Sequence, residues 1–125
     1  MVAALQDQGT IFRSSFITQD ILSHPAWHGE IRGLQADKLL RGAPTYTYLL
    51  RQGESSSETE TDYYVSFVLP DSTIRHQPFV VTIHPWGWCC ENNVGLGPFI
   101  YEGINDVLYL MMHCNQGEPI ALEFQ

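Results

Sequence analysis

Positive charge is scarce in this chain. Its 125 residues contain 6 Lys and Arg against 14 Asp and Glu, a formal net charge of −8. The cations all precede residue 76, and they are Arg13, Arg32, Lys38, Arg41, Arg51 and Arg75. Binding to nucleic acid or to an anionic membrane surface depends on clustered Lys and Arg. We therefore expect neither partner, and any site for an anion has to be local and focused.

Long apolar runs and paired cysteines are also missing. No apolar stretch reaches the roughly 18 residues of a membrane span, and the start, MVAALQDQG, lacks the cationic and apolar regions of a signal peptide. The 3 cysteines, with Cys89 and Cys90 adjacent, do not form an even disulfide framework. These absences predict a cytoplasmic chain with free thiols and no membrane span.

The length and the hydrophobic pattern predict one α+β domain. Residues 1–24 are weakly patterned and are predicted to be an N-terminal extension with a short helix near 19–22, which leaves a domain over 25–125. Apolar spacing predicts an amphipathic helix over 34–41 (Leu34, Ala36, Leu39, Leu40), closed by Gly42. A second helix is predicted to be capped by Asn105, with Val107, Leu110, Met111 and Cys114 on its core face.

Three strands are predicted between the helices, over residues 46–51, 62–69 and 73–83, with a short final strand within 119–124. They form a small antiparallel sheet flanked by the two helices. Two segments are predicted to be loops. Residues 52–61 hold Ser55, Ser56 and Ser57 among acidic residues, and residues 84–103 interleave Gly and Pro with Trp86 and Trp88. Connections longer than about 12–15 residues are uncommon in compact domains and usually functional.

Arg51 is out of place at the end of an apolar strand, Tyr48-Leu49-Leu50-Arg51. An unpaired buried charge is costly, so this guanidinium needs either a carboxylate of the chain or an external anion. Its planar donors fit phosphate oxygens in a bidentate fork, and the serine loop that follows offers hydroxyl and backbone N–H donors. A structural ion pair with Glu54 or Asp62 is the alternative, and spacing alone does not decide between the two.

Five short motifs, in order along the chain, resemble those of SH2 domains, the phosphotyrosine-binding modules. Trp27-His28-Gly29-Glu30-Ile31 resembles the opening Trp-(x)-His-Gly-x-Ile, Ala36-Asp37-Lys38-Leu39-Leu40 resembles Ala-Glu-x-Leu-Leu of the first helix, and Tyr48-Leu49-Leu50-Arg51 resembles the Phe-Leu-Val-Arg signature. Tyr63-Tyr64-Val65-Ser66-Phe67 resembles Tyr-x-Leu-Ser-Val, and Ile74-Arg75-His76 resembles Val-x-His. A weaker match continues through Ile104, Val107, Leu110 and His113.

The resemblance implies an SH2-like antiparallel sheet flanked by two helices, with a long insertion before the second. It also implies a monomer that binds tyrosine-phosphorylated proteins or peptides and needs no cofactor. Arg51 becomes the bidentate phosphate ligand, and Glu54 with Ser55, Ser56 and Ser57 becomes the phosphate-binding loop. Ser66 would hold the arginine and His76 would line the pocket. Arg32 would replace the arginine of the family's first helix, whose position is Gly33 here.

Departures from the SH2 pattern bear on specificity. Pro78 and Gly53 replace a cation and a small hydroxyl residue of the family, so we expect apolar packing rather than cation–π contacts to grip the phosphotyrosine ring. Residues 84–103 stand where the family has a short strand and a loop, and the segment 114–120 is short. We therefore expect little selectivity for flanking sequence. Trp86 and Trp88 would clasp the peptide, or else belong to the core or cover a sheet edge.

Other chemistries fit the residues less well. His113-Cys114 resembles the start of the tyrosine phosphatase loop, but no arginine follows it, so no enzyme is expected. The spacing of His84, Cys89, Cys90, His113 and Cys114 matches no common zinc pattern. The stronger alternative is an SH2-fold interaction module that binds a partner without phosphate. The chain is also similar to divergent SH2 domains of bacterial effectors, which would place it in the host cytosol.

Overall fold

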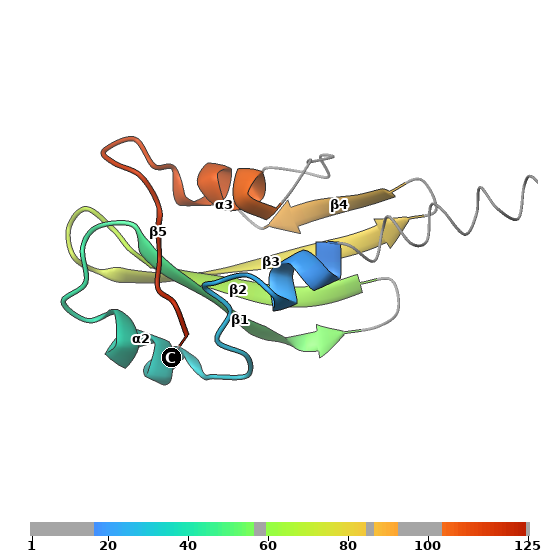
Figure 1. The fold of residues 1–125 in the computed structure, drawn as a ribbon, viewed down its shortest axis with the longest axis horizontal. Coiled ribbons are helices and arrows are strands. Elements are labelled where there is room, and N and C mark those ends of the chain that lie inside the picture. Colours follow the sequence, from blue (N-terminus) through green and yellow to red (C-terminus); the bar gives the residue numbers. More distant parts are fainter. Residues whose placement is uncertain (1–16, 57–59, 85–86, 93–103, 125) are drawn as a thin grey trace, which may run out of the picture.

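The structure is a computed structural model that describes residues 17–56, 60–84, 87–92 and 104–124. It is an α+β fold (Figure 1). Residues 17–22 are helical. The elements that follow are α2 (Gly33–Leu40), β1 (Thr47–Ser56), β2 (Glu60–Val68), β3 (Ile74–His84), β4 (Gly87–Asn92), α3 (Ile104–Met112) and β5 (Ile120–Ala121).

The strands form one five-stranded sheet in the order β4-β3-β2-β1-β5. The four strands from β1 to β4 pair antiparallel, each with the next, and β5 pairs parallel to β1. This register places Arg51 of β1 directly opposite Tyr64 of β2, and Ser66 of β2 directly opposite His76 of β3. These four residues, from three neighbouring strands, therefore lie in one part of the sheet.

Each face of the sheet is covered by helix, with α2 and α3 on opposite sides (Figure 1). Side chains alternate along β1, so Leu49 packs in the cluster with Ala36 and Leu40 of α2, whereas Tyr48 and Leu50 pack in the larger cluster on the α3 side. Arg51 follows Leu49 by two positions and therefore points to the α2 side of the sheet.

The core extends back into the segment predicted to be an N-terminal extension. Ile17 and Ile21, one helical turn apart, are buried in the α3-side cluster together with Ala26. The described part of residues 1–24 thus packs against the sheet, and the helix expected near 19–22 already includes Ile17.

The two predicted loops are partly strand. β1 continues to Ser56 and β2 begins at Glu60, so the solvated composition of 52–61 hid a ladder that pairs as far as Ser56 with Thr61. The segment predicted as one long loop over 84–103 contains β4, which pairs antiparallel with β3. Both segments form strands because they hydrogen-bond to a neighbouring strand, and the amino-acid composition of a segment does not reveal such pairing.

The second helix differs from its prediction at its start and in the face that it buries. It begins at Ile104, so Asn105 lies inside it, and the Asn105 side chain is used in a hydrogen bond with His24. Leu110, predicted to be buried, is 44% exposed. The buried stripe instead consists of Ile104, Val107, Leu108, Met111 and Met112. In α2, likewise, only Ala36 and Leu40 are buried, while Gly42 has the left-handed φ of 80° expected after a helix end.

Candidate functional site

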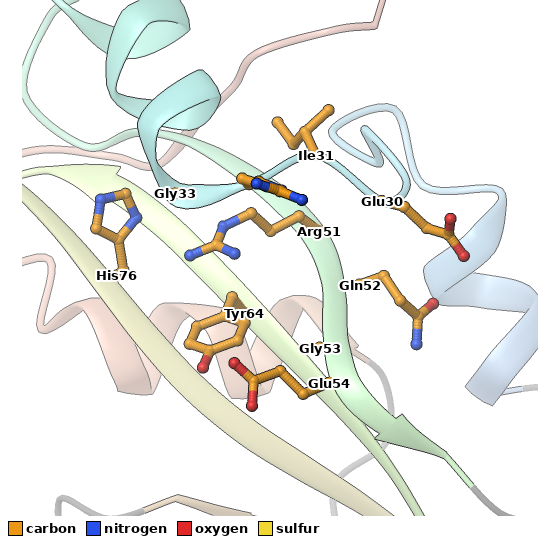
Figure 2. Close-up of a pocket in the computed structure, with 10 residues that line it drawn as sticks. Glu30, Ile31, Gly33, Arg51, Gln52, Gly53, Glu54, Tyr64 and His76 are labelled. Atoms are coloured by element: carbon orange, nitrogen blue, oxygen red, sulfur yellow. The ribbon is translucent and has the colours of Figure 1, made fainter.

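A cavity of about 570 Å³ opens on the α2 side of the sheet (Figure 2). It lies between the start of α2 and strands β1, β2 and β3, and Arg51 lies at its inner wall. The residues that line it are Glu30, Ile31, Arg32, Gly33, Arg51, Gln52, Gly53, Glu54, Tyr64 and His76. Its size falls in the range of about 300–1,000 Å³ that is usual for small-molecule sites.

Within the described residues, Arg51 makes its side-chain hydrogen bond through its inner nitrogen. Its side chain is 8% exposed, and Nε–H donates a hydrogen bond of 3.1 Å to Ser66 Oγ. Figure 2 shows the terminal nitrogens of the guanidinium directed toward the space between Tyr64 and His76. Because Nε is already used, the terminal nitrogens are the donors that remain for a ligand in the cavity.

A hydrogen-bonded chain continues from Ser66 to α2. Ser66 Oγ lies 2.7 Å from His76 Nδ1, and His76 Nε2 lies 2.7 Å from Asp37 Oδ1. The Asp37 carboxylate accepts only, so His76 Nε2–H is the donor to it. His76 Nδ1 then accepts from the Ser66 hydroxyl, which leaves the Ser66 oxygen to accept from Arg51. Each of the three hydrogen bonds between Arg51 and Asp37 thus has one donor and one acceptor, with the donor always on the Arg51 side.

Tyr64 supports the guanidinium from the neighbouring strand. The Arg51 guanidinium carbon lies 4.2 Å from the centre of the Tyr64 ring, a cation–π contact. Burial lowers the pKa of Arg51 from its ordinary value, while Tyr64 and Asp37 act in the opposite direction. An arginine remains a cation at neutral pH even so. Within the described ranges, Arg51 forms no ion pair with a carboxylate, and the nearby Asp37 carboxylate instead accepts a hydrogen bond from His76.

The mouth of the cavity carries charges of both signs. Glu30, Glu54 and Arg32 are exposed and line it. Arg32 is also the N-cap of α2, where its backbone N–H donates to the Gln35 side chain over 2.8 Å. The two carboxylates at the opening repel an anion. They therefore favour a ligand that carries its negatively charged group past them to Arg51.

A bulge in β1 shapes the floor of the mouth. The register with β2 shifts between Gln52 and Ser56, so that three residues of β1 lie opposite Asp62 alone. A Cβ added at Gly53 would lie 2.5 Å from the Asp62 carbonyl oxygen, which no real side chain tolerates. Glycine is therefore required where the resembled family has a small hydroxyl residue. The bulge also interrupts the backbone ladder beside Glu54.

The structure gathers most of the site residues predicted from the sequence. Arg51, Arg32, Glu54 and His76 line the cavity, and Ser66 lies behind Arg51 with no exposed surface. Ser55 is the last residue of the bulge and Ser56 ends β1; their side chains lie outside the described part, as does all of Ser57. Trp88 belongs to β4, at the opposite edge of the sheet from β5, and its side chain is not described; Trp86 lies outside the described residues.

Two residues that shape the site, Tyr64 and Asp37, were not predicted from the sequence. Tyr64 was part of a strand motif, and its position opposite Arg51 becomes visible only when the strands are paired in register. Asp37 was part of a helix motif, and it meets His76 across 39 residues of sequence. Strand pairing of the motifs at 48–51 and 63–67 could have found Tyr64, but no sequence signal points to Asp37.

The sequence also offered His and Cys residues for a metal and Cys114 for nucleophilic chemistry, and the side chains of His84, Cys89 and Cys90 lie outside the described part. Among the described residues, no group of three or more His, Cys, Asp or Glu side chains is placed to hold a metal ion. Cys114 is a buried free thiol whose pKa is raised, mainly by burial and further by Glu118. A raised pKa is the opposite of what a thiolate nucleophile requires. No helix in the described part of the chain is long and apolar enough to span a membrane.

Comparison with known proteins places the chain in no family. No family model matches the sequence, and no curated protein matches it significantly.

Proposed function

We propose that this protein is a divergent SH2-type module that binds phosphotyrosine in the Arg51 cavity, with little selectivity for the flanking sequence. The observation that carries the proposal is a buried guanidinium that opens onto a cavity and has no carboxylate partner in the described structure. A cation held in this way is stabilised when an external anion completes its contacts. Phosphate suits the planar pair of terminal nitrogens better than a monovalent anion does.

The depth of Arg51 favours an aryl phosphate. Arg51 is 8% exposed and stands behind a mouth lined by Glu30 and Glu54. A phosphate on a short side chain would stay near these carboxylates, whereas the phenyl ring of phosphotyrosine carries its phosphate inward. Ile31 and the ring of Tyr64 give the cavity apolar surface for that ring. The proposed ligand thus combines a dianion at Arg51 with apolar packing behind it.

Three side chains, two on the sheet and one on α2, position the Arg51 guanidinium. Ser66, His76 and Asp37 hold the inner nitrogen through a hydrogen-bonded chain with all donors and acceptors matched. A guanidinium held before binding loses less conformational entropy when the phosphate arrives. In this proposal Arg51 is the ligand-binding residue, and the other three orient it.

Replacing Arg51 tests the proposal directly. Hydrogen bonds to charged groups contribute about 1.5–3 kcal/mol each, so loss of two weakens binding by about 100-fold or more. We expect this for Arg51→Leu with a fluorescent phosphotyrosine peptide, with the thermal midpoint of the variant close to that of the unmodified chain. Arg75→Leu is the matched control, because Arg75 is exposed and lies on β3 next to His76, on the other face of the sheet. Binding should also weaken below about pH 6, where phosphate loses its second charge.

The carboxylates at the mouth favour one alternative, an interaction module that docks a partner at this cavity without phosphate. Glu30 and Glu54 would attract cationic rather than anionic side chains. The same peptide in phosphorylated and unphosphorylated forms separates the two functions. Equal affinity for both forms, or an Arg51→Leu variant that binds as well as the Arg75→Leu control, would reject phosphotyrosine recognition.

A further inference from the structure

A second cavity, of about 520 Å³, opens on the opposite face of the sheet. It is bounded by the segment around His24, by α3, and by the residues that lead into β5. Its apolar walls are Pro25, Leu108, Pro119 and Ala121, and its charged groups are Asp106 and Glu118. None of its lining residues belongs to the Arg51 cavity.

Tyr48 lines this cavity with a side chain that is almost wholly buried. The residue is 6% exposed and lines the cavity, and its hydroxyl has no hydrogen bond within the described residues. Burial, and to a smaller extent Cys114, raises its pKa, so the hydroxyl stays neutral. The hydroxyl oxygen is not sealed off from the cavity, so it remains available as a hydrogen-bond partner for a ligand there.

His24 fixes one wall of the cavity in a defined state. Its Nδ1 accepts the backbone N–H of Ala26 over 3.0 Å, and its Nε2 lies 2.9 Å from Asn105 Oδ1. Because Nδ1 accepts, the proton is on Nε2 and donates to Asn105, so the ring is neutral. The wall therefore ties the first turn of α3 to the segment before β1, and it adds no positive charge to offset Asp106 and Glu118.

We propose that this second cavity binds the basic side chain, arginine or lysine, of a partner protein. The two carboxylates attract the cationic head, and the apolar walls suit its aliphatic stem. The Tyr48 hydroxyl offers an oxygen acceptor at the inner end. All charged groups that line the cavity are negative, so the charge match is specific in sign. This site is independent of phosphotyrosine binding and would survive failure of that function.

The test uses an arginine blocked at both ends as N-acetyl-arginine methylamide, titrated into the full chain and followed by amide NMR. We expect shifts at Ala26, Tyr48, Tyr109 and Ala121, which lie in or beside the cavity. The matching citrulline compound has the same shape without the charge, and it should produce no such shifts. Arg51→Leu should leave the arginine titration unchanged.

Variants then assign the binding to this cavity. Tyr48→Phe removes only the hydroxyl, and we expect about threefold weaker binding with unchanged or higher thermal stability. Asp106→Asn with Glu118→Gln should weaken binding about tenfold. Glu123→Gln, an exposed acid outside the cavity, should change it by less than about twofold.

Three results would overturn the proposal. These are equal shifts with the citrulline compound, shifts that map to Glu30 and Glu54 instead, and a Glu123→Gln effect as large as that of the double variant. The double variant alters two exposed residues, so the test remains valid even if Tyr48→Phe does not fold.

Discussion

At the scale of single residues, the Arg51 cavity depends on groups that position the guanidinium as much as on the guanidinium itself. Asp37 lies at the far end of the chain of hydrogen bonds, 2.7 Å from His76, and does not line the cavity. Without it, His76 loses the acceptor for Nε2–H, and its ring is no longer held toward Ser66. Asp37 should therefore affect binding from a distance.

We expect Asp37→Ala to weaken phosphotyrosine peptide binding by about three- to tenfold. This is less than the free energy of one hydrogen bond to a charged group, because Asp37 acts on Arg51 only through His76 and Ser66. Lys38→Ala is the control, since Lys38 is the next residue of α2 and is exposed. Combining Asp37→Ala with Ser66→Ala should cost less than the sum of the two, because both act through one hydrogen-bonded chain. Additive effects in such a double-mutant cycle, measured by fluorescence anisotropy, would show that Asp37 acts separately.

Glycine at position 53 is required by close backbone approach, not by a special φ. A Cβ there would collide with the Asp62 backbone, whereas a Cβ at Gly33 would meet only Arg51 Nη2 at an ordinary 3.6 Å. We expect Gly53→Ala to lower the free energy of unfolding by about 1–3 kcal/mol, the usual cost of overpacking. Gly33→Ala should be neutral or stabilising, by up to about 1 kcal/mol. Urea unfolding of both variants measures this, and equal stability of the two would contradict the clash.

At the scale of elements, the shortest strand secures the strand that carries Arg51. β5 comprises only Ile120–Ala121, yet Ile120 N–H donates to Tyr46 O over 2.9 Å, and Leu122 N–H donates to Tyr48 O over 2.8 Å. His28 Nε2 lies 2.8 Å from Leu122 O and holds the same segment from the other side. Without these bonds, β1 would present an unpaired edge over residues 46–48, whereas beside Arg51 the same edge is paired with the segment 26–29.

Proline at position 120 tests this role of β5. Ile120→Pro removes the N–H that bonds to Tyr46, and we expect it to lower the free energy of unfolding by about 2 kcal/mol or more. Ile120→Ala keeps the bond, and because Ile120 is 46% exposed it should cost less than about 1 kcal/mol. Chemical denaturation would reject the role of β5 if both variants lost equal stability.

At the scale of the whole molecule, the proposed ligand is an anion and its receptor is strongly acidic. The chain carries a net charge of −8, so long-range electrostatics oppose the approach of a phosphopeptide while Arg51 attracts it only at short range. The two cavities add to this asymmetry, since the Arg51 cavity and the acidic cavity around Tyr48 lie on opposite faces of the sheet. A phosphotyrosine ligand and a basic side chain could therefore bind at the same time.

Salt should accelerate association, which is unusual for phosphate binding. We expect the association rate constant of a phosphotyrosine peptide with no other charges to rise about two- to threefold between 20 and 200 mM NaCl, as the repulsion is screened. The buried contact with Arg51 is screened less, so the dissociation rate should change little. Stopped-flow fluorescence measures both. A rate constant that falls with salt would mean that a local positive field around Arg51 and Arg32 dominates the encounter.

Local patterns in the sequence were enough for the positions of the main elements and for the choice of Arg51. Alternation along Tyr48-Leu49-Leu50-Arg51 depends only on neighbouring residues, so it could predict an arginine pointing off an apolar strand. Sequence patterns gave wrong predictions where pairing or packing with a neighbouring element decides the local structure. β4 and the end of β1 are strands because of their partners, and Leu110 is exposed because α3 docks through a different stripe.

What the sequence determined by itself is an acidic α+β chain with one candidate anion-binding arginine, since charge balance and side-chain periodicity are properties of the chain alone. Whether that arginine is free for a ligand was decided only by tertiary structure. The register of β1 with β2 puts Tyr64 beside it and Ser66 behind it, and the docking of α2 commits Asp37 to His76. Hydrogen-bond partners depend on distances of a few ångströms between residues far apart in sequence, and only packing sets such distances.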